Sequence, residues 1–308
     1  MVVRPLETGD IESVVERVAS SLQGDATRNA LINPDFSHDV FALALTSVLD
    51  QTWVALVEGR IVGHLYGAVL ENAEHGRGAW IGPDGVSFDD AATLFALYDV
   101  AAATWVSRGA LEHYAWVRDD DDATAPWYEM GFARAHSRGV IELTTPRTAS
   151  WPGGYRLRRG DLGDLEVALT LDRVLDAAEG RAPSQSVGAE TATLREEWRE
   201  LLSDEEVHHY LVEFAGDAVA QCVTYPLPSQ RGSFLRTVHV SAVVVIPTHE
   251  HHGVARSLLD AALNDARAAG FRYAETSWRV SNHRAAQFWR RYGFRPTYVR
   301  LRRTITAD

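Results

Sequence analysis

The sequence predicts an α+β protein, with mixed α/β sheets flanked by helices, in which one plan occurs twice. Short β-branched runs alternate with apolar residues at helical spacing, and the same succession occurs in both halves of the chain. A cluster of turn-forming residues separates the halves. Because 308 residues suffice for two ordinary domains, we expect domains at 1–146 and 155–308, joined by a linker at 147–154.

Three segments of the first half recur in the second half in the same order. The corresponding segments are 3–12 with 157–166, 53–59 with 210–216, and 120–132 with 282–294. The first predicts a strand followed by a helix whose start an Asp can cap. The second predicts a β-hairpin with a turn at glycine, and the third predicts a short helix. Such a series rarely arises by chance, so we predict a tandem of related domains.

The second half contains a turn of the kind that binds anions. Residues 241–246 are apolar and β-branched, which predicts a buried strand, and Pro247 ends it because proline cannot donate to a ladder. Gly253 permits a positive φ or close backbone approach. From Val254 onward, apolar residues recur at helical spacing. Such a turn directs free N–H groups and the positive end of a helix dipole to one point, which predicts a phosphate site.

This turn resembles the signature of the GNAT superfamily of acetyl-coenzyme A dependent N-acetyltransferases. The signature is Pro, two residues, Arg or Gln, two residues, Gly, one residue, then Gly or Ala. Pro247, Gly253 and Ala255 match it, whereas Glu250 stands at the Arg or Gln position. A carboxylate there repels a pyrophosphate that arginine would attract, so we expect weaker binding at a retained site.

A second segment, 280–294, resembles the family helix that lies along the pantetheine arm of the coenzyme. Asn282 and Ala285 match its start, and the Gly-Phe step at its end is present. Trp289 replaces the tyrosine that often protonates the departing thiolate in the family. For Phe288, core packing is the alternative to a coenzyme contact.

The resemblance implies that acetyl-CoA is the co-substrate and that backbone groups of the strand hold its pantetheine like an added strand. The implied coenzyme residues are Val243, Val244, Val245, Glu250, His251, His252, Gly253, Val254, Ala255, Arg256, Asn282, Ala285, Phe288 and Trp289. The histidines at 249–252 lack the spacing that places two ligands on one helical face. We therefore expect no metal.

The resemblance also implies that the acceptor amine attacks the thioester directly, without a covalent enzyme intermediate. Several family members carry a catalytic Glu eleven residues before the Arg or Gln position, which here is His239. Imidazole suits proton abstraction near neutral pH, although a histidine that only packs is the alternative. Strand alternation places His239 on one face with Val243 and Val245. Tyr292 is the candidate acid, with packing as its alternative.

The first half lacks the features of the phosphate turn. After Pro83 no glycine stands at the matching position, and Asp89 and Asp90 lie near the start of the next predicted helix. Carboxylates there occupy the positive end of the helix dipole, which a phosphate would need. We therefore expect a degenerate N-terminal domain and an active C-terminal domain.

Composition narrows the partners. The net charge of −12 argues against nonspecific nucleic-acid binding, and no apolar run is long enough for a membrane span. The first residues show no secretory signal pattern, so we expect a cytoplasmic protein, as a monomer or homodimer. We expect the acceptor to be an amine of a small molecule or peptide, bound by helices within 171–206.

Two other functions fit the same motifs. Glu250 and Trp289 depart from the family pattern at the positions nearest charge and proton transfer, which suits a noncatalytic acyl-CoA-binding or interaction protein. A mycothiol-synthase-like acetyltransferase, also a tandem GNAT protein, is the alternative within the same class.

Overall fold

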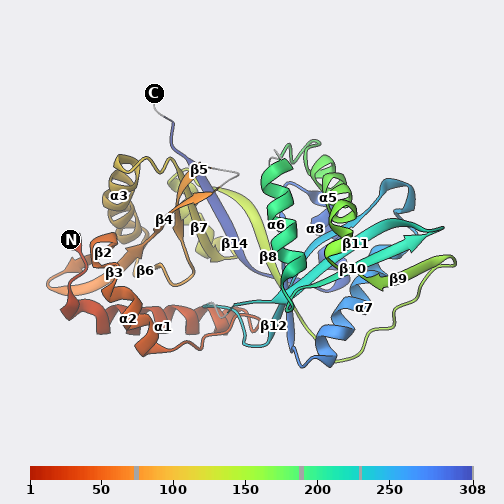
Figure 1. The fold of residues 1–308 in the computed structure, drawn as a ribbon. Coiled ribbons are helices and arrows are strands. Elements are labelled where there is room, and N and C mark those ends of the chain that lie inside the picture. Colours follow the sequence, from red (N-terminus) through yellow and green to blue (C-terminus); the bar gives the residue numbers. More distant parts are fainter. Residues whose placement is uncertain (73–75, 187–190, 229–230, 307–308) are drawn as a thin grey trace. The chain divides into compact units, whose positions relative to one another are not determined.

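The structure is a computed structural model that describes residues 1–72, 76–186, 191–228 and 231–306 (Figure 1). The chain divides into two compact units, each built of mixed sheet and helices, which confirms the predicted α+β class. The first unit contains the described residues of 1–138, 231–233 and 296–306. The second unit contains those of 139–228 and 234–295.

The first unit has two sheets, with strand orders β1-β2-β3-β6 and β4-β5-β7-β14. Its elements are β1 (Val2–Pro5), α1 (Ile11–Arg28), α2 (His38–Thr46), β2 (Thr52–Val57), β3 (Arg60–Tyr66), β4 (Ala68–Asn72), β5 (Gly76–Ile81), β6 (Val86–Phe88), α3 (Ala91–Ser107), β7 (Glu112–Arg118), α4 (Asp121–Glu129) and β14 (Arg295–Thr304). The pair of β5 and β7 is parallel, whereas β7 and β14 are antiparallel.

The second unit has the strand order β8-β13-β12-β11-β10-β9, with β12 and β13 parallel. Its elements are β8 (Ala133–Glu142), β9 (Tyr155–Arg159), α5 (Leu165–Glu179), α6 (Thr191–Ser203), β10 (His208–Phe214), β11 (Asp217–Pro226), β12 (Thr237–Val245), α7 (Val254–Ala268), β13 (Tyr273–Arg279), α8 (His283–Tyr292) and the first residue of β14. The first six residues of β8 belong to the first unit.

The last strand of each half of the sequence ends in the unit formed by the other half. Val299 and Leu301 of β14 are buried in the core of the first unit, and Ile141 of β8, with the adjoining Leu143, is buried in the core of the second. The expected boundary at 147–154 assigns residues 296–308 to the second half. The contacts instead assign the described residues from 296 onward to the first unit, because β14 forms its ladder with β7.

The recurring segments adopt the same local structure in both units. Arg4 donates to Asp10 at 2.6 and 3.0 Å, and Arg158 donates to Asp164 at 2.7 and 2.7 Å, so each first strand is tied to the turn before its helix. The β2–β3 hairpin turns through Glu58 and Gly59, and the β10–β11 hairpin turns through Ala215 and Gly216, all four with positive φ. The predicted internal repeat is therefore present at the level of individual turns.

Helices cover both faces of the sheet in the second unit. Leu258, Leu259 and Leu263 of α7 pack with Val238 and Val240 on one face. On the other face, Leu171 of α5 packs with Leu211 and Val244, while α6 contributes Leu194 and Trp198. The strands between these layers are buried on both sides, which fixes the positions of their ends. No helix of the described chain is long and apolar enough to cross a membrane.

We expect Leu301→Ala to loosen the first unit, although Leu301 lies near the end of the chain. Its side chain is fully buried, and a cavity at such a site costs about 2–5 kcal/mol in the free energy of unfolding. Hydrogen exchange should accelerate in β7 and α3 of the first unit. Leu43→Ala, at a side chain that is 73% exposed, is the control. Acceleration confined to α7 and β12 would contradict the assignment of β14 to the first unit.

Candidate active site

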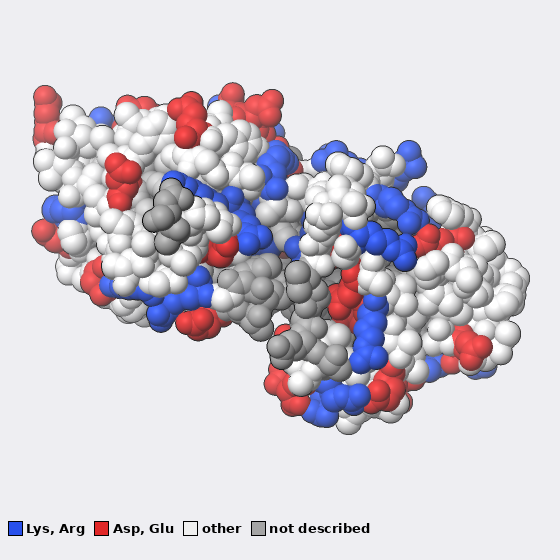
Figure 2. Space-filling view, turned by 90° about the horizontal axis from the view of Figure 1, so that it is seen from above, with Lys and Arg blue, Asp and Glu red and all other residues white. Residues whose placement is uncertain are grey.

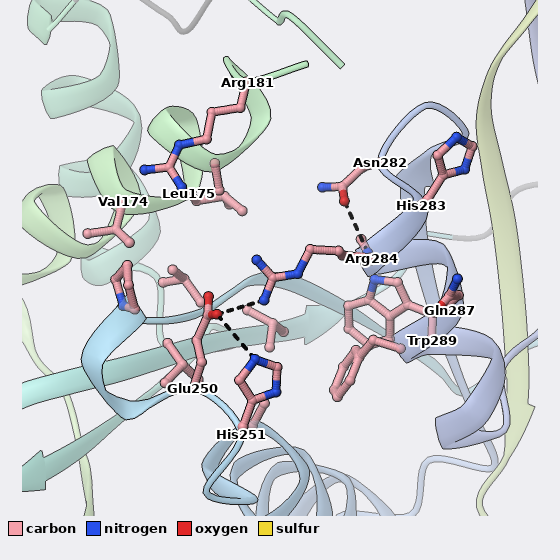
Figure 3. Close-up of a pocket in the computed structure, with 18 of the residues that line it drawn as sticks. Val174, Leu175, Arg181, Glu250, His251, Asn282, His283, Arg284, Gln287 and Trp289 are labelled. Carbon is pink, nitrogen blue, oxygen red and sulfur yellow. Dashed lines mark hydrogen bonds and ion pairs between the residues drawn. The ribbon is translucent and has the colours of Figure 1, made fainter. Parts of the chain in front are cut away.

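A cavity of about 950 Å³ opens in the second unit where the end of β12 meets the starts of α7 and α8 and the end of α5 (Figure 3). Its volume lies within the range of about 300–1,000 Å³ that is usual for ligand pockets. Apolar residues of β12 form one wall, and α8 forms another. The loop that follows α5, including Arg181 and Ser184, also lines it.

The wall formed by β12 depends on an irregularity in that strand. The ladder of β11 and β12 shifts register between Gln221 and Val223, and Ala242 opposite them has φ 48°. Such a bulge adds one residue to the strand and reverses the alternation of side chains beyond it. Val243 and Val245 therefore pack on the α7 face with Val240.

His239 lies on the opposite face, because it is paired with Tyr225, which packs with the core under α5 and α6. The expectation that His239 shares a face with Val243 and Val245 is therefore wrong. Simple alternation of side chains fails at Ala242, where the extra residue of the bulge is inserted.

Beyond His239 the strands β12 and β13 separate. Their parallel ladder ends at the pair His239–Glu275, although β12 continues to Val245 and β13 to Arg279. Ile246 donates its N–H to Val219 of β11 at 2.9 Å, so the backbone groups of the preceding Val245 point to the opposite edge. That edge faces the cavity, where an extended ligand can bind as an added strand.

The turn after β12 leaves the start of α7 open. His251 and Gly253 have φ values of 66° and 82°, and Gly253 forms the N-cap without a side-chain hydrogen bond. The N–H groups of Val254, Ala255 and Arg256 in the first turn therefore receive no side-chain cap. An uncapped helix start of this kind suits an anionic ligand.

In the first unit, the helix that follows β6 has a different start. Asp90 caps α3, and its carboxylate accepts hydrogen bonds from the Thr93 N–H and hydroxyl at 2.8 Å each. These hydrogen bonds hold the pKa of Asp90 below its ordinary value. The position that a phosphate would need is thus occupied by a side chain of the protein itself.

The cavity is rich in arginine although the chain as a whole is acidic. Among the described residues that line it, the charged side chains comprise one carboxylate, Glu250, and five arginines: Arg173, Arg181, Arg256, Arg284 and Arg291. The face drawn in Figure 2 carries both acidic and basic side chains on each unit. The cavity therefore presents a local positive field that suits a polyanionic ligand.

Glu250 forms an ion pair with another residue that lines the cavity. Its Oε2 lies 2.6 Å from Nη2 of Arg284, which comes from the first turn of α8, and 3.9 Å from Nε2 of the neighbouring His251 (Figure 3). Arg284 thus reaches from α8 toward the turn before α7. Glu250 stands at the position of the family's Arg or Gln, and its carboxylate is paired with the guanidinium of Arg284 from α8.

The residues of α8 combine structural and lining roles. Asn282 accepts a hydrogen bond from the Ala285 N–H at 3.1 Å and caps the helix, and it also faces the cavity. Trp289 is 7% exposed and packs edge-on against Phe294. Its indole forms part of the wall, and in the sequence Trp289 stands at the position of the family's tyrosine.

Tyr292 also lines the cavity, but its hydroxyl donates to Asp260 Oδ1 at 2.7 Å. Burial and the neighbouring Asp260 carboxylate raise the pKa of Tyr292. Its proton is thus directed at a carboxylate within the core. This geometry favours the packing interpretation of Tyr292 over the role of an acid.

The cavity gathers the predicted coenzyme residues with one exception. His252 does not line it, whereas the others do. His239 lies outside the lining, at the point where β12 and β13 separate. Sequence reasoning missed Arg173, Arg181, Arg284 and Arg291. Arg284 and Arg291 are seven residues apart on α8, so helical spacing could have placed them on one face. No comparable pattern in the sequence singles out Arg173 and Arg181.

His239 lies in a row of polar side chains across three neighbouring strands. It is paired with Tyr225 of β11 and with Glu275 of β13. The Tyr225 and His239 rings lie 5.0 Å apart between centroids, and Glu275 is 3% exposed. Burial, together with the charge of Glu275, raises the pKa of Tyr225. The row places Tyr225, His239 and Glu275 side by side at the point where β12 and β13 separate.

Comparison with known proteins agrees with this geometry. Residues 174–294 match the model of the acetyltransferase (GNAT) family, so this part of the chain is a GNAT domain. No curated protein matches the chain.

Solved structures of GNAT proteins resemble the whole chain. A GCN5-related N-acetyltransferase from Sphaerobacter thermophilus has a TM-score of 0.65 at 18% identity, covering 100% of this chain and 96% of its own. A tandem GNAT protein from the clavulanic acid biosynthesis pathway has a TM-score of 0.55 at 17% identity. The match covers 100% of this chain and 99% of that protein. The predicted tandem of GNAT folds is confirmed.

Asp172 of α5, next to the lining residue Arg173, is a partly buried carboxylate. It accepts a hydrogen bond from Trp198 Nε1 at 3.1 Å. Burial raises the pKa of Asp172 to about 6, and the negative charges of Asp176, Glu197 and Glu179 add to this effect. Among the described residues, no cluster of three or more His, Cys, Asp or Glu side chains is arranged to hold a metal ion.

We expect Asp172→Asn to stabilise the protein above pH 6. Because the pKa of Asp172 rises from 3.8 to about 6 on folding, stability falls as the pH rises through this window and stays lower above it. Asn keeps an acceptor for Trp198 and removes that cost, about 1–3 kcal/mol in the free energy of unfolding. Urea denaturation at pH 8 and pH 4 should show a gain only at pH 8. The exposed Glu200→Gln is the control, and an equal gain at both pH values would contradict the expectation.

Proposed function

We propose that the protein is an acetyl-CoA dependent N-acetyltransferase whose second unit transfers an acetyl group to a primary amine of a small molecule or peptide. The observation that carries this proposal is the arginine-lined cavity beside the end of β12, with the uncapped start of α7 in its lining. It lies within the segment that matches the acetyltransferase family. Acetyl-CoA supplies the activated acetyl group.

The residues of the cavity fit this co-substrate. Backbone groups of Val243–Val245 would hold the extended pantetheine, and N–H groups at Gly253–Arg256 would hold the pyrophosphate. Asn282, Ala285, Phe288 and Trp289 would form the wall beside it. His252 takes no part in this proposal because it does not line the cavity.

His239 is our candidate for the group that accepts the proton of the acceptor ammonium. It stands where β12 and β13 begin to separate, on the face covered by α5 and α6. An acceptor bound under these helices would reach the strand opening from that side. General-base assistance of this kind contributes about 10²–10⁴-fold to a rate.

We propose that the first unit is degenerate and does not bind the coenzyme. The carboxylate of Asp90 already caps α3, so a phosphate would have to displace it against electrostatic repulsion. The first unit then contributes its fold rather than a second active centre.

A noncatalytic acyl-CoA-binding protein is the second candidate. Glu250 replaces a cation at the turn, and the hydroxyl of Tyr292 is bonded to Asp260 rather than offered to the cavity. The first feature weakens a retained binding site, and the second leaves the Tyr292 hydroxyl unable to act as an acid in the cavity.

A panel of amines with acetyl-CoA, read by release of free thiol, tests the proposal. The chain has no lysine, so no lysine of the protein competes as acceptor. We expect turnover with at least one amine, and we expect Gly253→Glu to abolish both turnover and acetyl-CoA binding in calorimetry. Gly270→Glu, at the other end of α7 with a similar positive φ, controls for backbone strain. Acetyl-CoA binding without turnover across the panel would favour the noncatalytic candidate.

We expect His239→Ala to lower kcat by about 10²-fold or more and to remove the acidic limb of the pH profile, since that limb reports protonation of the base. Coenzyme affinity should stay unchanged because His239 does not line the cavity. Circular dichroism and a thermal melt check the fold. A pH profile of unaltered shape would exclude His239 as the base.

A further inference from the structure

The ion pair between Glu250 and Arg284 joins two residues that line the cavity. Glu250 precedes α7 and Arg284 lies in the first turn of α8, so the pair links the two helix starts that border the cavity (Figure 3). The inference drawn from this pair rests on the proposed binding of acetyl-CoA.

The pair is exposed enough to exchange partners. The Arg284 side chain is 72% exposed and that of Glu250 is 30% exposed. Ion pairs with such exposure add little to stability, because water competes for both groups and the side chains lose freedom. Breaking this contact therefore costs little when a stronger anion is offered to Arg284.

We propose that Arg284 exchanges Glu250 for the pyrophosphate of the coenzyme, and that it supplies from α8 the cation that the turn before α7 lacks. A guanidinium can donate two parallel hydrogen bonds to phosphate oxygens, whereas Arg284 donates one to Glu250, at 2.6 Å. Glu250 holds Arg284 in place until the phosphate arrives.

The pyrophosphate is the group favoured by position. Glu250 lies three residues before Gly253, whose turn directs the uncapped N–H groups of α7 at the cavity. Arg284 is held against this turn by the ion pair itself, so a phosphate bound at the helix start lies within reach of the same guanidinium. The 3′-phosphate of the coenzyme is the other phosphate that could take this partner.

The two halves of the ion pair have opposite expected effects. Arg284→Gln should weaken CoA binding by about 5–20-fold in calorimetry, because a charge-assisted contact is lost. Glu250→Gln should tighten it by about 3–10-fold, because both the repulsion of the phosphate and the competition for Arg284 disappear. In the Glu250→Gln background, Arg284→Gln should reduce CoA affinity by a larger factor than in the wild-type background. In the wild type part of the effect is hidden, because Glu250 competes with the phosphate for Arg284.

Matched variants and ligands sharpen the test. Arg290→Gln removes an exposed arginine of the same helix that does not line the cavity, and it should leave affinity unchanged. Arg284→Lys should keep part of the contribution of Arg284 to CoA affinity, because it keeps the positive charge. The Arg284→Gln penalty should persist with dephospho-CoA, which lacks the 3′-phosphate, and vanish with pantetheine, which lacks all phosphates.

Each contrary result has a definite meaning. If wild-type protein binds CoA and Arg284→Gln binds it equally well, the exchange is refuted while the proposed function stands. A penalty that disappears with dephospho-CoA overturns the pyrophosphate assignment. Weaker binding by both single variants, with a double variant no worse than either, would make the pair a structural brace and refute the exchange. A wild-type protein that does not bind CoA would refute the proposed function as well.

Discussion

The candidate site depends on the separation of two parallel strands. The ladder between β12 and β13 ends at His239–Glu275, and the bulge at Ala242 then turns the β12 side chains over. These two features leave backbone groups of Val245 without a neighbouring strand and direct Val243 and Val245 toward the α7 side. The cavity lies beside the end of β12, beyond the point where this pairing stops, and residues of α5, α7 and α8 form the rest of its walls.

The starts of the corresponding helices α3 and α7 differ in what satisfies them. In the first unit, Asp90 provides the negative charge that the dipole of α3 attracts. In the second unit, α7 begins at Gly253 without a side-chain cap, and arginines surround the same region. A single carboxylate at the capping position therefore separates a structural helix start from one that can receive an anion. Glu250 is a carboxylate near the start of α7, but it is paired with Arg284 and does not cap the helix.

The exchange of last strands ties the two repeats together. Leu301 of β14 fills the core of the first unit, and Ile141 of β8 fills that of the second. Each repeat therefore completes its core with a strand supplied by the other half. The core of the second unit is therefore incomplete without Ile141 and Leu143, which come from the end of the first half of the sequence.

The sequence by itself determined the repeat, the element order and many of the residues that line the cavity. These follow from local rules, because turn glycines, caps and periodicity act within a few residues of Gly253 and Asn282. Tertiary structure alone decided the face of His239, the partner of the Tyr292 hydroxyl and the ion pair of Glu250 with Arg284. It also decided which unit receives each last strand. Bulges and strand pairing join residues far apart in sequence, so no local pattern encodes them.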